Sequence, residues 1–336
     1  MSARVGQILL PQRLFTGKLS GWLQVLEQKF AVQEYDPSRL DPRYFRILSE
    51  EPGVELFIFP AAFTLNTDWI SPGFQGALGS IATGNDHVHL DGLSKRGIRF
   101  YHAPGCNAAS VAEFCAGVWA LLFGSVEELC AQHLGIVGYG RIGRLLGRIA
   151  AAVGMPFTYY DPLLESVDRS ALRRATIISF HVPLTDEGPF ATRGMLNEEY
   201  LKDLTSCRYL INTSRGKIWT DEGLAAAEGM DLCFDVFPIE PPAHLYGCRH
   251  VSPHVAGYNA SARQKGLAMV LDAFLKDRGE KVTWPQVATE PTDFSGFTAP
   301  GLEDSLLRAN PANFSPRRAA YPLRGDIFDL RLDSLS

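Results

Sequence analysis

The segment from Leu134 to Asp161 constrains the fold most, because it joins a short apolar strand, a glycine-rich turn, an amphipathic helix and a second strand ending in an acid. The turn reads Gly138-Tyr139-Gly140-Arg141-Ile142-Gly143. In such a unit the first glycine permits a tight turn, the second lets the backbone approach a pyrophosphate, and the third lets the helix pack closely on the sheet. The helix N-terminus then faces the phosphates. The segment predicts a Rossmann-type dinucleotide site at Gly138, Gly140 and Gly143.

The acid at the end of this segment predicts which dinucleotide is bound. Asp161 directly follows the expected strand Phe157 to Tyr160. A carboxylate at this place accepts hydrogen bonds from both ribose hydroxyls of NAD and repels the 2′-phosphate of NADP. We therefore predict NAD, rather than NADP, as the cofactor.

Composition limits the kinds of partner. The 336 residues suffice for two domains, and a net charge of −5 gives no basic surface for nucleic acid. No apolar run approaches the roughly 20 residues of a membrane span, and the first residues lack the apolar core of a signal peptide. We expect a cytoplasmic protein with no nucleic-acid or membrane partner. His87 and His89 are spaced to present ligands from one strand face, but we expect no metal site.

Strands and helices alternate from the start of the chain, which predicts a parallel α/β structure. Two long helices, from a cap at Asn107 to about Phe123 and from about Ala260 to Lys276, are expected to join two domains. We predict a Rossmann-type doubly wound parallel sheet inserted into a smaller flavodoxin-like α/β substrate domain. The expected parts are a first substrate segment (1–105), the NAD-binding domain (106–259), a return helix (260–284) and a C-terminal extension packed on the body or on a second subunit (285–336).

Three polar residues follow strands of the expected nucleotide domain. Arg215 follows the buried strand that ends near Asn212, Glu240 follows the strand from Leu232 to Val236, and His254 follows Val251. Strand ends of an open parallel sheet line its ligand crevice, so we expect the three to meet at one edge.

These residue types fit hydride transfer between NAD and a 2-hydroxy acid. Arginine offers a forked donor for a carboxylate, histidine titrates near neutrality and can take the hydroxyl proton, and a glutamate beside it stabilises the imidazolium. Taken singly, Arg215, Glu240 and His254 fit a surface arginine, a helix cap and a structural histidine equally well. Their combination predicts a catalytic site.

Motifs along the chain resemble those of the D-isomer-specific 2-hydroxyacid dehydrogenases from about residue 79 to 270. The resemblance is carried by the glycine turn, Gly84-Asn85-Asp86-His87-Val88, Ala103–Ala108, Asp161-Pro162, His181-Val182-Pro183-Leu184, Asn212–Gly216, Asp235–Pro241 and Pro253–Tyr258. It implies Arg215 as the substrate anchor, His254 as acid and base, and Glu240 as its partner. It also implies a homodimer, a substrate contact from Tyr258, and NAD contacts from Arg141, Ile142, Asp161, Val182, Thr213, Asp235 and Gly257.

Within the family, the motifs are most similar to the branch that oxidises 4-phosphoerythronate in vitamin B6 biosynthesis. Two departures concern the phosphate, because Phe59-Pro60-Ala61-Ala62 replaces an Arg-Ser pair and Ala82 replaces a threonine. Replacement donors are expected near Thr83 and Asn85. Further candidates are Arg263, Lys265 and the C-terminal segment around Arg317 of a second copy.

The resemblance thus implies an NAD-dependent dehydrogenase that converts 4-phospho-D-erythronate to 2-oxo-3-hydroxy-4-phosphobutanoate. The alternative is a general D-2-hydroxyacid dehydrogenase of the glyoxylate/hydroxypyruvate reductase or phosphoglycerate dehydrogenase type. A third class, an NAD-sensing corepressor that binds partner proteins, is disfavoured because no charged interaction tail is evident.

Overall fold

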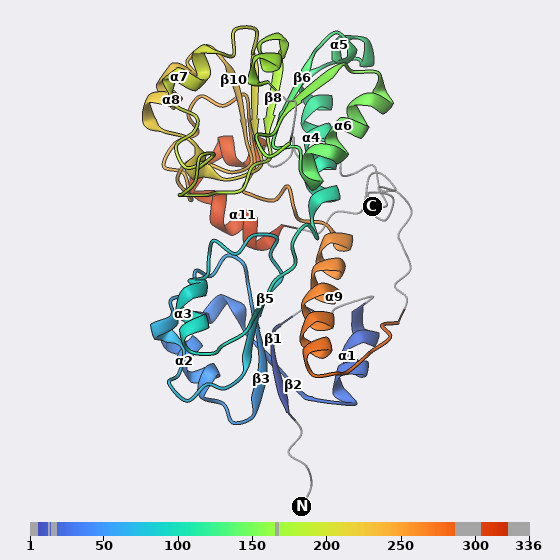
Figure 1. Cartoon of the computed structure of the whole chain (residues 1–336), viewed down its shortest axis with the longest axis vertical. Helices are drawn as coiled ribbons and strands as arrows, with labels where there is room; N and C mark the ends of the chain where they lie inside the picture. Colours follow the sequence, from blue (N-terminus) through green and yellow to red (C-terminus); the bar gives the residue numbers. More distant parts are fainter. Residues whose placement is uncertain (1–5, 13, 15–18, 165–167, 286–303, 322–336) are drawn as a thin grey trace, which may run out of the picture. The chain divides into compact units, whose positions relative to one another are not determined.

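The structure is a computed structural model, which describes residues 6–12, 14, 19–164, 168–285 and 304–321 (Figure 1). The chain divides into two compact units: residues 1–106 with 263–289, and residues 107–262 with 290–336. The second unit is therefore inserted into the sequence of the first. Of the expected C-terminal extension, residues 286–303 and 322–336 lie outside the described residues.

The first unit contains a five-stranded, wholly parallel sheet with the order β2-β1-β3-β4-β5. Its strands are β1 (Gln7–Pro11), β2 (Ala31–Tyr35), β3 (Val54–Phe59), β4 (Ala77–Ser80) and β5 (Phe100–Tyr101). Its helices are α1 (Ser20–Glu27), α2 (Pro42–Glu50), α3 (Leu90–Lys95) and α9 (Ala260–Asp277), whose first residues belong to the second unit. The order is that of flavodoxin-like folds, as the sequence predicts.

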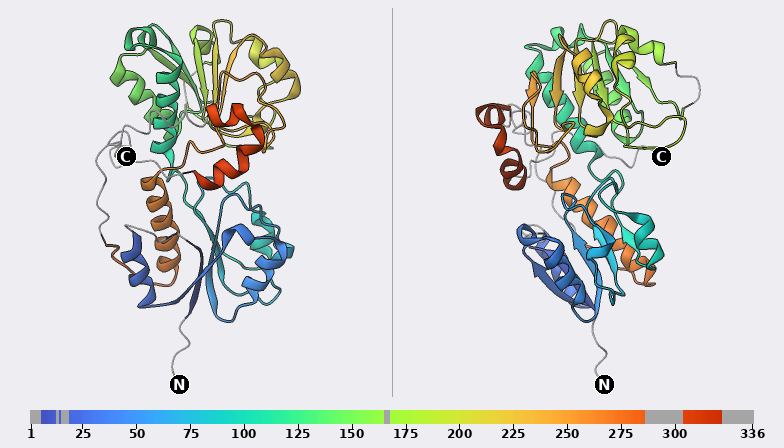
Figure 2. Two further views of the ribbon diagram at one scale, coloured as in Figure 1. Left: turned by 180° about the vertical axis from the view of Figure 1, so that it is seen from behind. Right: turned by 90° about the vertical axis from the view of Figure 1, so that its left-hand side faces the viewer.

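Different helices cover the two faces of this sheet (Figure 1, Figure 2). Successive side chains of a strand point to opposite faces. Ile8 and Leu10 of β1 are accordingly buried in one cluster with α1 and α9, and Leu9 in another with α2 and α3. Burial of apolar area, worth roughly 25 cal/mol per Å², holds the helices on both faces.

The second unit contains a six-stranded parallel sheet with the order β11-β10-β9-β8-β6-β7. Its strands are β6 (Leu134–Val137), β7 (Phe157–Tyr160), β8 (Ile177–Phe180), β9 (Tyr209–Asn212), β10 (Asp231–Phe234) and β11 (His250–Val251). In the sheet, β7 lies on one side of β6, and β8, the next strand along the chain, lies on the other side of β6. In doubly wound folds ligands bind where the strand order reverses in this way, which here is at the carboxyl ends of β6 and β8.

Helices α4 and α6 lie side by side on the second unit (Figure 1). The helices of this unit are α4 (Ala108–Leu122), α5 (Val126–Cys130), α6 (Arg141–Val153), α7 (Glu198–Lys202), α8 (Asp221–Ala226) and α11 (Phe314–Ala320). Short 3₁₀ turns occur at Pro37–Arg39, Thr67–Trp69, Arg169–Arg174, Gly216–Ile218 and Pro311–Asn313. Residues 304–309 are also helical.

The predicted fold class is confirmed, with differences at particular residues. Asn107 is the N-cap residue of α4, but its side chain does not accept a hydrogen bond from the first turn of the helix. The prediction that Asn107 caps this helix is therefore wrong. Strand β2 was not predicted from the sequence because Ala31–Tyr35 shows no buried apolar run: only Tyr35 is buried. No helix among the described residues is long and apolar enough to cross a membrane.

Candidate active site

The glycine turn between β6 and α6 has the steric properties that its sequence predicts. Gly138 has a φ of 88°, and a Cβ there would lie 2.6 Å from the carbonyl oxygen of His181. A Cβ on Gly143 would lie 2.3 Å from the carbonyl oxygen of Gly138. A Cβ on Gly140 would meet no atom within 4 Å. Gly138 and Gly143 are thus needed for packing, while Gly140 leaves open space where a pyrophosphate fits.

The N-terminus of α6 supplies donors beside that open space. The helix begins at Arg141 and Ile142, Gly140 provides no side-chain cap, and the first turn contains no acidic residue. The first N–H groups of a helix have no partner within it and carry partial positive charge. Together with the turn, they fit the anionic pyrophosphate of NAD.

Asp161 ties the end of β7 to the glycine turn. Its Oδ2 accepts a hydrogen bond from the N–H of Tyr139 at 2.9 Å, and its Oδ1 accepts one from the N–H of Leu163 at 3.0 Å. A carboxylate has about four acceptor sites, so lone pairs remain for ribose hydroxyls. The predicted cofactor acid therefore also holds the turn in shape.

The ends of β8 and β9 carry two more of the expected cofactor contacts. Val182 lies next to the turn, with its Cγ1 3.1 Å from the place of a Cβ on Gly138. Thr213 Oγ1 lies 3.5 Å from Nδ1 of His181. Burial lowers the pKa of His181 to about 3, so this ring is neutral at pH 7. Gly257, another expected contact, faces Asn107, whose Nδ2 lies 2.4 Å from the place of a Cβ.

The three candidate catalytic residues lie after three adjacent strands. Arg215 follows β9, Glu240 follows β10 and His254 follows β11, and these strands are neighbours in the sheet. Because the strands are parallel, their carboxyl ends form one edge. The residues therefore share the edge that the sequence predicts.

His254 and Glu240 form a direct pair. His254 Nδ1 donates to Oε2 of Glu240 at 2.8 Å, and the side chains are 30% and 20% exposed. The other carboxylate oxygen, Oε1, accepts a hydrogen bond from the N–H of Phe237 at 3.1 Å. With Nδ1 engaged as a donor, the tautomer leaves Nε2 of a neutral His254 as the acceptor.

His254 itself has a left-handed backbone, with a φ of 59°, which is uncommon for a residue with a side chain. The buried carboxylate of Asp235 holds this turn. It accepts hydrogen bonds from Ser252 Oγ at 2.8 Å, from the N–H of Val255 at 2.8 Å and from the N–H of Ala256 at 3.0 Å. Asp235, expected as an NAD contact, thus also positions the loop that carries His254.

A buried amide holds the loop that carries Arg215. Asn212 Nδ2 donates to the carbonyl oxygens of Val236 at 2.9 Å and Arg215 at 3.2 Å, while its Oδ1 accepts from Ser214 N–H and Oγ. The Arg215 and Glu240 loops are thereby linked through one side chain. Asn212 was named from the sequence only as part of a family motif, and its role in positioning these loops was not predicted. Its amide side chain at the end of a buried strand was the feature that could have indicated this role.

The expected substrate residues fall in different units. Thr83 and Asn85 belong to the first unit, where Thr83 Oγ1 lies 3.7 Å from Cys106 Sγ. Tyr258 belongs to the second unit, and its hydroxyl accepts a hydrogen bond from Nε of Arg318 at 3.4 Å. Arg318 lies in the C-terminal segment around Arg317 that was expected to supply donors from a second copy, but it contacts Tyr258 of its own chain.

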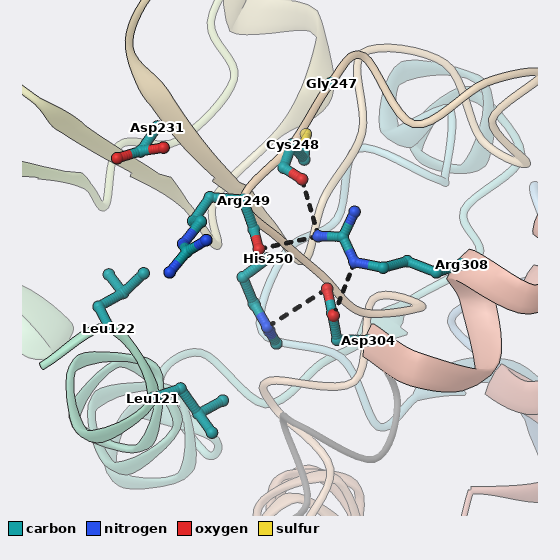
Figure 3. A pocket seen from close by; sticks show the side chains of 9 residues that line it. All are labelled: Leu121, Leu122, Asp231, Gly247, Cys248, Arg249, His250, Asp304 and Arg308. Carbon is teal, nitrogen blue, oxygen red and sulfur yellow. Dashed lines mark hydrogen bonds and ion pairs between the residues drawn. The ribbon is translucent and has the colours of Figure 1, made fainter. Parts of the chain in front are cut away.

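A polar cavity of about 560 Å³ lies away from this edge (Figure 3). Its lining includes Asp231 at the start of β10, and Arg249 and His250 at the start of β11. It therefore lies toward the amino ends of these strands, opposite the crevice expected for a ligand. In Figure 3 the side chains of His250 and Arg308 both point to Asp304.

His250 is expected to make folding stability sensitive to acid. Burial lowers its pKa from 6.5 to about 4, against the opposing pull of Asp304. The unfolded chain then binds a proton that the folded chain excludes, so stability is lost as the pH falls from about 6.5 toward 4. We expect His250→Gln to reduce the drop in unfolding free energy between pH 7 and pH 5 by up to about 2 kcal/mol.

Urea unfolding at the two pH values measures this effect. His244→Gln, which removes an exposed histidine, is the matched control and should leave the pH dependence as in the wild type. An identical drop in the His250→Gln protein would contradict the prediction.

Comparison with known proteins places this site in a family. Residues 109–256 match the family model described as D-isomer specific 2-hydroxyacid dehydrogenase, NAD binding domain. A relative from Photorhabdus laumondii is 32% identical over 269 residues, covering 74% of this chain and 71% of the relative. The chain belongs to the D-isomer-specific 2-hydroxyacid dehydrogenase family, which confirms the predicted family and NAD as the predicted cofactor.

The Photorhabdus relative is an erythronate-4-phosphate dehydrogenase. So is a relative from Tolumonas auensis, which is 32% identical over 221 residues that cover 61% of this chain. The chain spans only 59% of the length of the Tolumonas protein.

Solved structures show the same fold at lower identity. An NAD⁺-bound 3-phosphoglycerate dehydrogenase of Entamoeba histolytica has a TM-score of 0.68 and 20% identity, covering 86% of this chain and all of that chain (100%). A D-lactate dehydrogenase of Treponema pallidum has a TM-score of 0.65 and 19% identity, covering 83% and 98%.

Proposed function

We propose that this protein oxidises 4-phospho-D-erythronate to 2-oxo-3-hydroxy-4-phosphobutanoate with NAD, as a step toward pyridoxal 5′-phosphate. The observation that carries the proposal is the 2.8 Å bond between His254 and Glu240 at the edge of an NAD-binding sheet. The erythronate-4-phosphate dehydrogenases among the relatives support the choice of substrate. A cytoplasmic location and a homodimer are part of the same proposal.

The proposed roles follow from the geometry of the edge. Arg215 binds the substrate carboxylate with its forked guanidinium. His254 Nε2 accepts the proton of the C2 hydroxyl, and Glu240 stabilises the resulting imidazolium through Nδ1. Asp235 and Asn212 hold the two loops, so little reorganisation is needed when the substrate binds.

NAD, when bound, accepts the hydride from C2 of the substrate. The N–H groups at the start of α6 would hold its pyrophosphate, and Asp161 would accept hydrogen bonds from its ribose hydroxyls. Val182, Thr213 and Gly257 complete the proposed contacts, with Arg141 and Ile142 at the helix start.

A general D-2-hydroxyacid dehydrogenase is the second candidate, and one feature of the first unit favours it. Phe59 at the end of β3 is buried, and Pro60, Ala61 and Ala62 follow it. None of these side chains can donate a hydrogen bond to a phosphate. The proposed phosphate site must therefore draw its donors from other residues, among them Thr83 and Asn85.

Purified protein with NAD and a panel of acids, followed at the NADH absorbance, tests the proposal. We expect 4-phosphoerythronate to be oxidised with a kcat/KM at least about tenfold above that of erythronate, D-lactate or D-glycerate. An acid that lacks the phosphate would leave the cations of the phosphate site without an anionic partner. Equal rates for phosphorylated and unphosphorylated acids would favour the second candidate. No oxidation of any acid in the panel would reject both.

Cofactor choice is expected to depend on the charge of Asp161. Asp161→Asn keeps an oxygen that can accept from Tyr139 but removes the negative charge that repels a 2′-phosphate. We expect the NAD-to-NADP ratio of kcat/KM to fall roughly tenfold. A wild-type enzyme that already prefers NADP, or a variant with an unchanged ratio, would contradict this role.

A further inference from the structure

Arg318 of α11 reaches the catalytic pair from the C-terminal part of the chain. Its Nη1 lies 3.4 Å from Oε2 of Glu240, the same oxygen that accepts from His254. Its Nε lies 3.4 Å from the hydroxyl of Tyr258. Its side chain is only 22% exposed. All four residues belong to the second unit.

Aromatic contacts at both ends of α11 fix the position of this arginine. Phe314, the first residue of the helix, packs on Phe237 with ring centroids 5.8 Å apart. Tyr321, just after the helix, packs on Tyr258 at 6.2 Å. Both Phe314 and Tyr321 are buried. The helix is therefore packed against the loops that carry Glu240 and Tyr258.

The hydrogen bonds of Arg318 leave part of its guanidinium unused. Both of its contacts are long, at 3.4 Å, and Nη2 makes no hydrogen bond to any residue in the described part of the chain. Burial alone would lower the pKa of Arg318, but the oxygens of Tyr258, Glu240 and Asp235 outweigh it and raise the pKa. The guanidinium is therefore cationic, and its Nη2 can still donate hydrogen bonds to a ligand.

Two arginines at this edge can each bind an anionic group. Arg215 follows β9, and Arg318 shares the carboxylate of Glu240 with His254. Asp235 already accepts three hydrogen bonds from its own loop. When Arg215 binds the substrate carboxylate, Arg318 can still bind a second anion, because both of its own contacts are long and a partly buried cation favours an anionic partner.

We propose that Arg318 is the second anion-binding residue of the site and binds the anionic group at the far end of the 2-hydroxy acid. In the substrate proposed above this group is the 4-phosphate, so the inference rests on the proposed function. Arg318 would supply, from the same chain, a donor that the Phe59–Ala62 segment lacks.

The ratio of kcat/KM for 4-phosphoerythronate to that for erythronate tests the proposal. We expect Arg318→Ala to lower this ratio about 10- to 100-fold, the worth of a charge-assisted hydrogen bond, mainly through KM of the phosphorylated acid. Arg318→Lys, which keeps the charge, should restore part of the ratio. Arg174→Ala removes the same charge from an exposed side chain of the same unit, outside the proposed site, and should leave the ratio unchanged.

Two results would overturn the assignment. One is an unchanged ratio in Arg318→Ala. The other is an equal fall of kcat for both acids, which would mean that Arg318 only supports Glu240. Circular dichroism spectra and melting temperatures of the variants exclude loss of folding as the cause.

Binding of inorganic phosphate to the full chain, measured by calorimetry, separates this inference from the proposed function. We expect Arg318→Ala to bind phosphate at least about tenfold more weakly than both the wild type and Arg174→Ala. Equal binding by all three proteins rejects the role of Arg318. A wild-type enzyme that binds phosphate through Arg318 but does not oxidise 4-phosphoerythronate rejects the proposed substrate alone.

Discussion

Replacing His254 by asparagine is expected to lower kcat by roughly 10²- to 10⁴-fold, the usual contribution of general acid and base catalysis. Asparagine can donate a hydrogen bond to Glu240 from its amide, but it cannot take the hydroxyl proton. The affinity for NAD should change little, because the glycine turn and Asp161 are untouched. Steady-state kinetics with saturating NAD, and NADH binding followed by fluorescence, measure the two quantities.

The matched comparison is Glu240→Gln, which keeps an acceptor for His254 Nδ1 but removes the charge that stabilises the imidazolium. Its kcat should fall less than that of His254→Asn, because the proton acceptor is still present. Near-full turnover in His254→Asn would remove this histidine from the mechanism.

Replacing Arg215 by alanine is expected to lower kcat/KM about 10- to 150-fold, because the substrate carboxylate loses charge-assisted hydrogen bonds worth about 1.5 to 3 kcal/mol. The loss should appear in KM as well as in kcat, since the carboxylate is present before and during hydride transfer. Arg215→Lys keeps the charge but not the forked geometry, and should recover only part of the activity.

Arg215→Ala leaves its backbone carbonyl available to Asn212, so the loop should keep its shape. Melting temperatures near that of the wild type would support this reading of the variant. Unchanged KM and kcat would place the carboxylate elsewhere.

Local sequence patterns predicted the nucleotide-binding part well because its constraints are local. Gly138 needs its left-handed φ of 88°, Gly143 lies against the carbonyl oxygen of Gly138, and the strand Phe157–Tyr160 is found with the expected bounds. That Arg215, Glu240 and His254 share one edge followed from their places after parallel strands, whereas Glu240 as the partner of His254 was implied by the family resemblance.

Contacts made by segments distant in sequence could not be predicted in the same way. Arg318 lies 78 positions from Glu240 and 60 from Tyr258, and no spacing rule connects them. Asp235 was expected only as a cofactor contact, since the bonds that it accepts from the His254 loop depend on how that loop folds back. Strand β2 was missed because it lies at the edge of the sheet, where only one of its residues, Tyr35, is buried.

The left-handed backbone at His254 sets conformational stability against activity at a single position. Asparagine adopts this conformation more readily than most residues with a side chain. Backbone geometry of this kind costs about 1 to 3 kcal/mol, so the inactive asparagine variant should unfold no more easily than the wild type. Selection for a stable fold alone would therefore tend to replace this histidine, and its persistence would record selection for turnover.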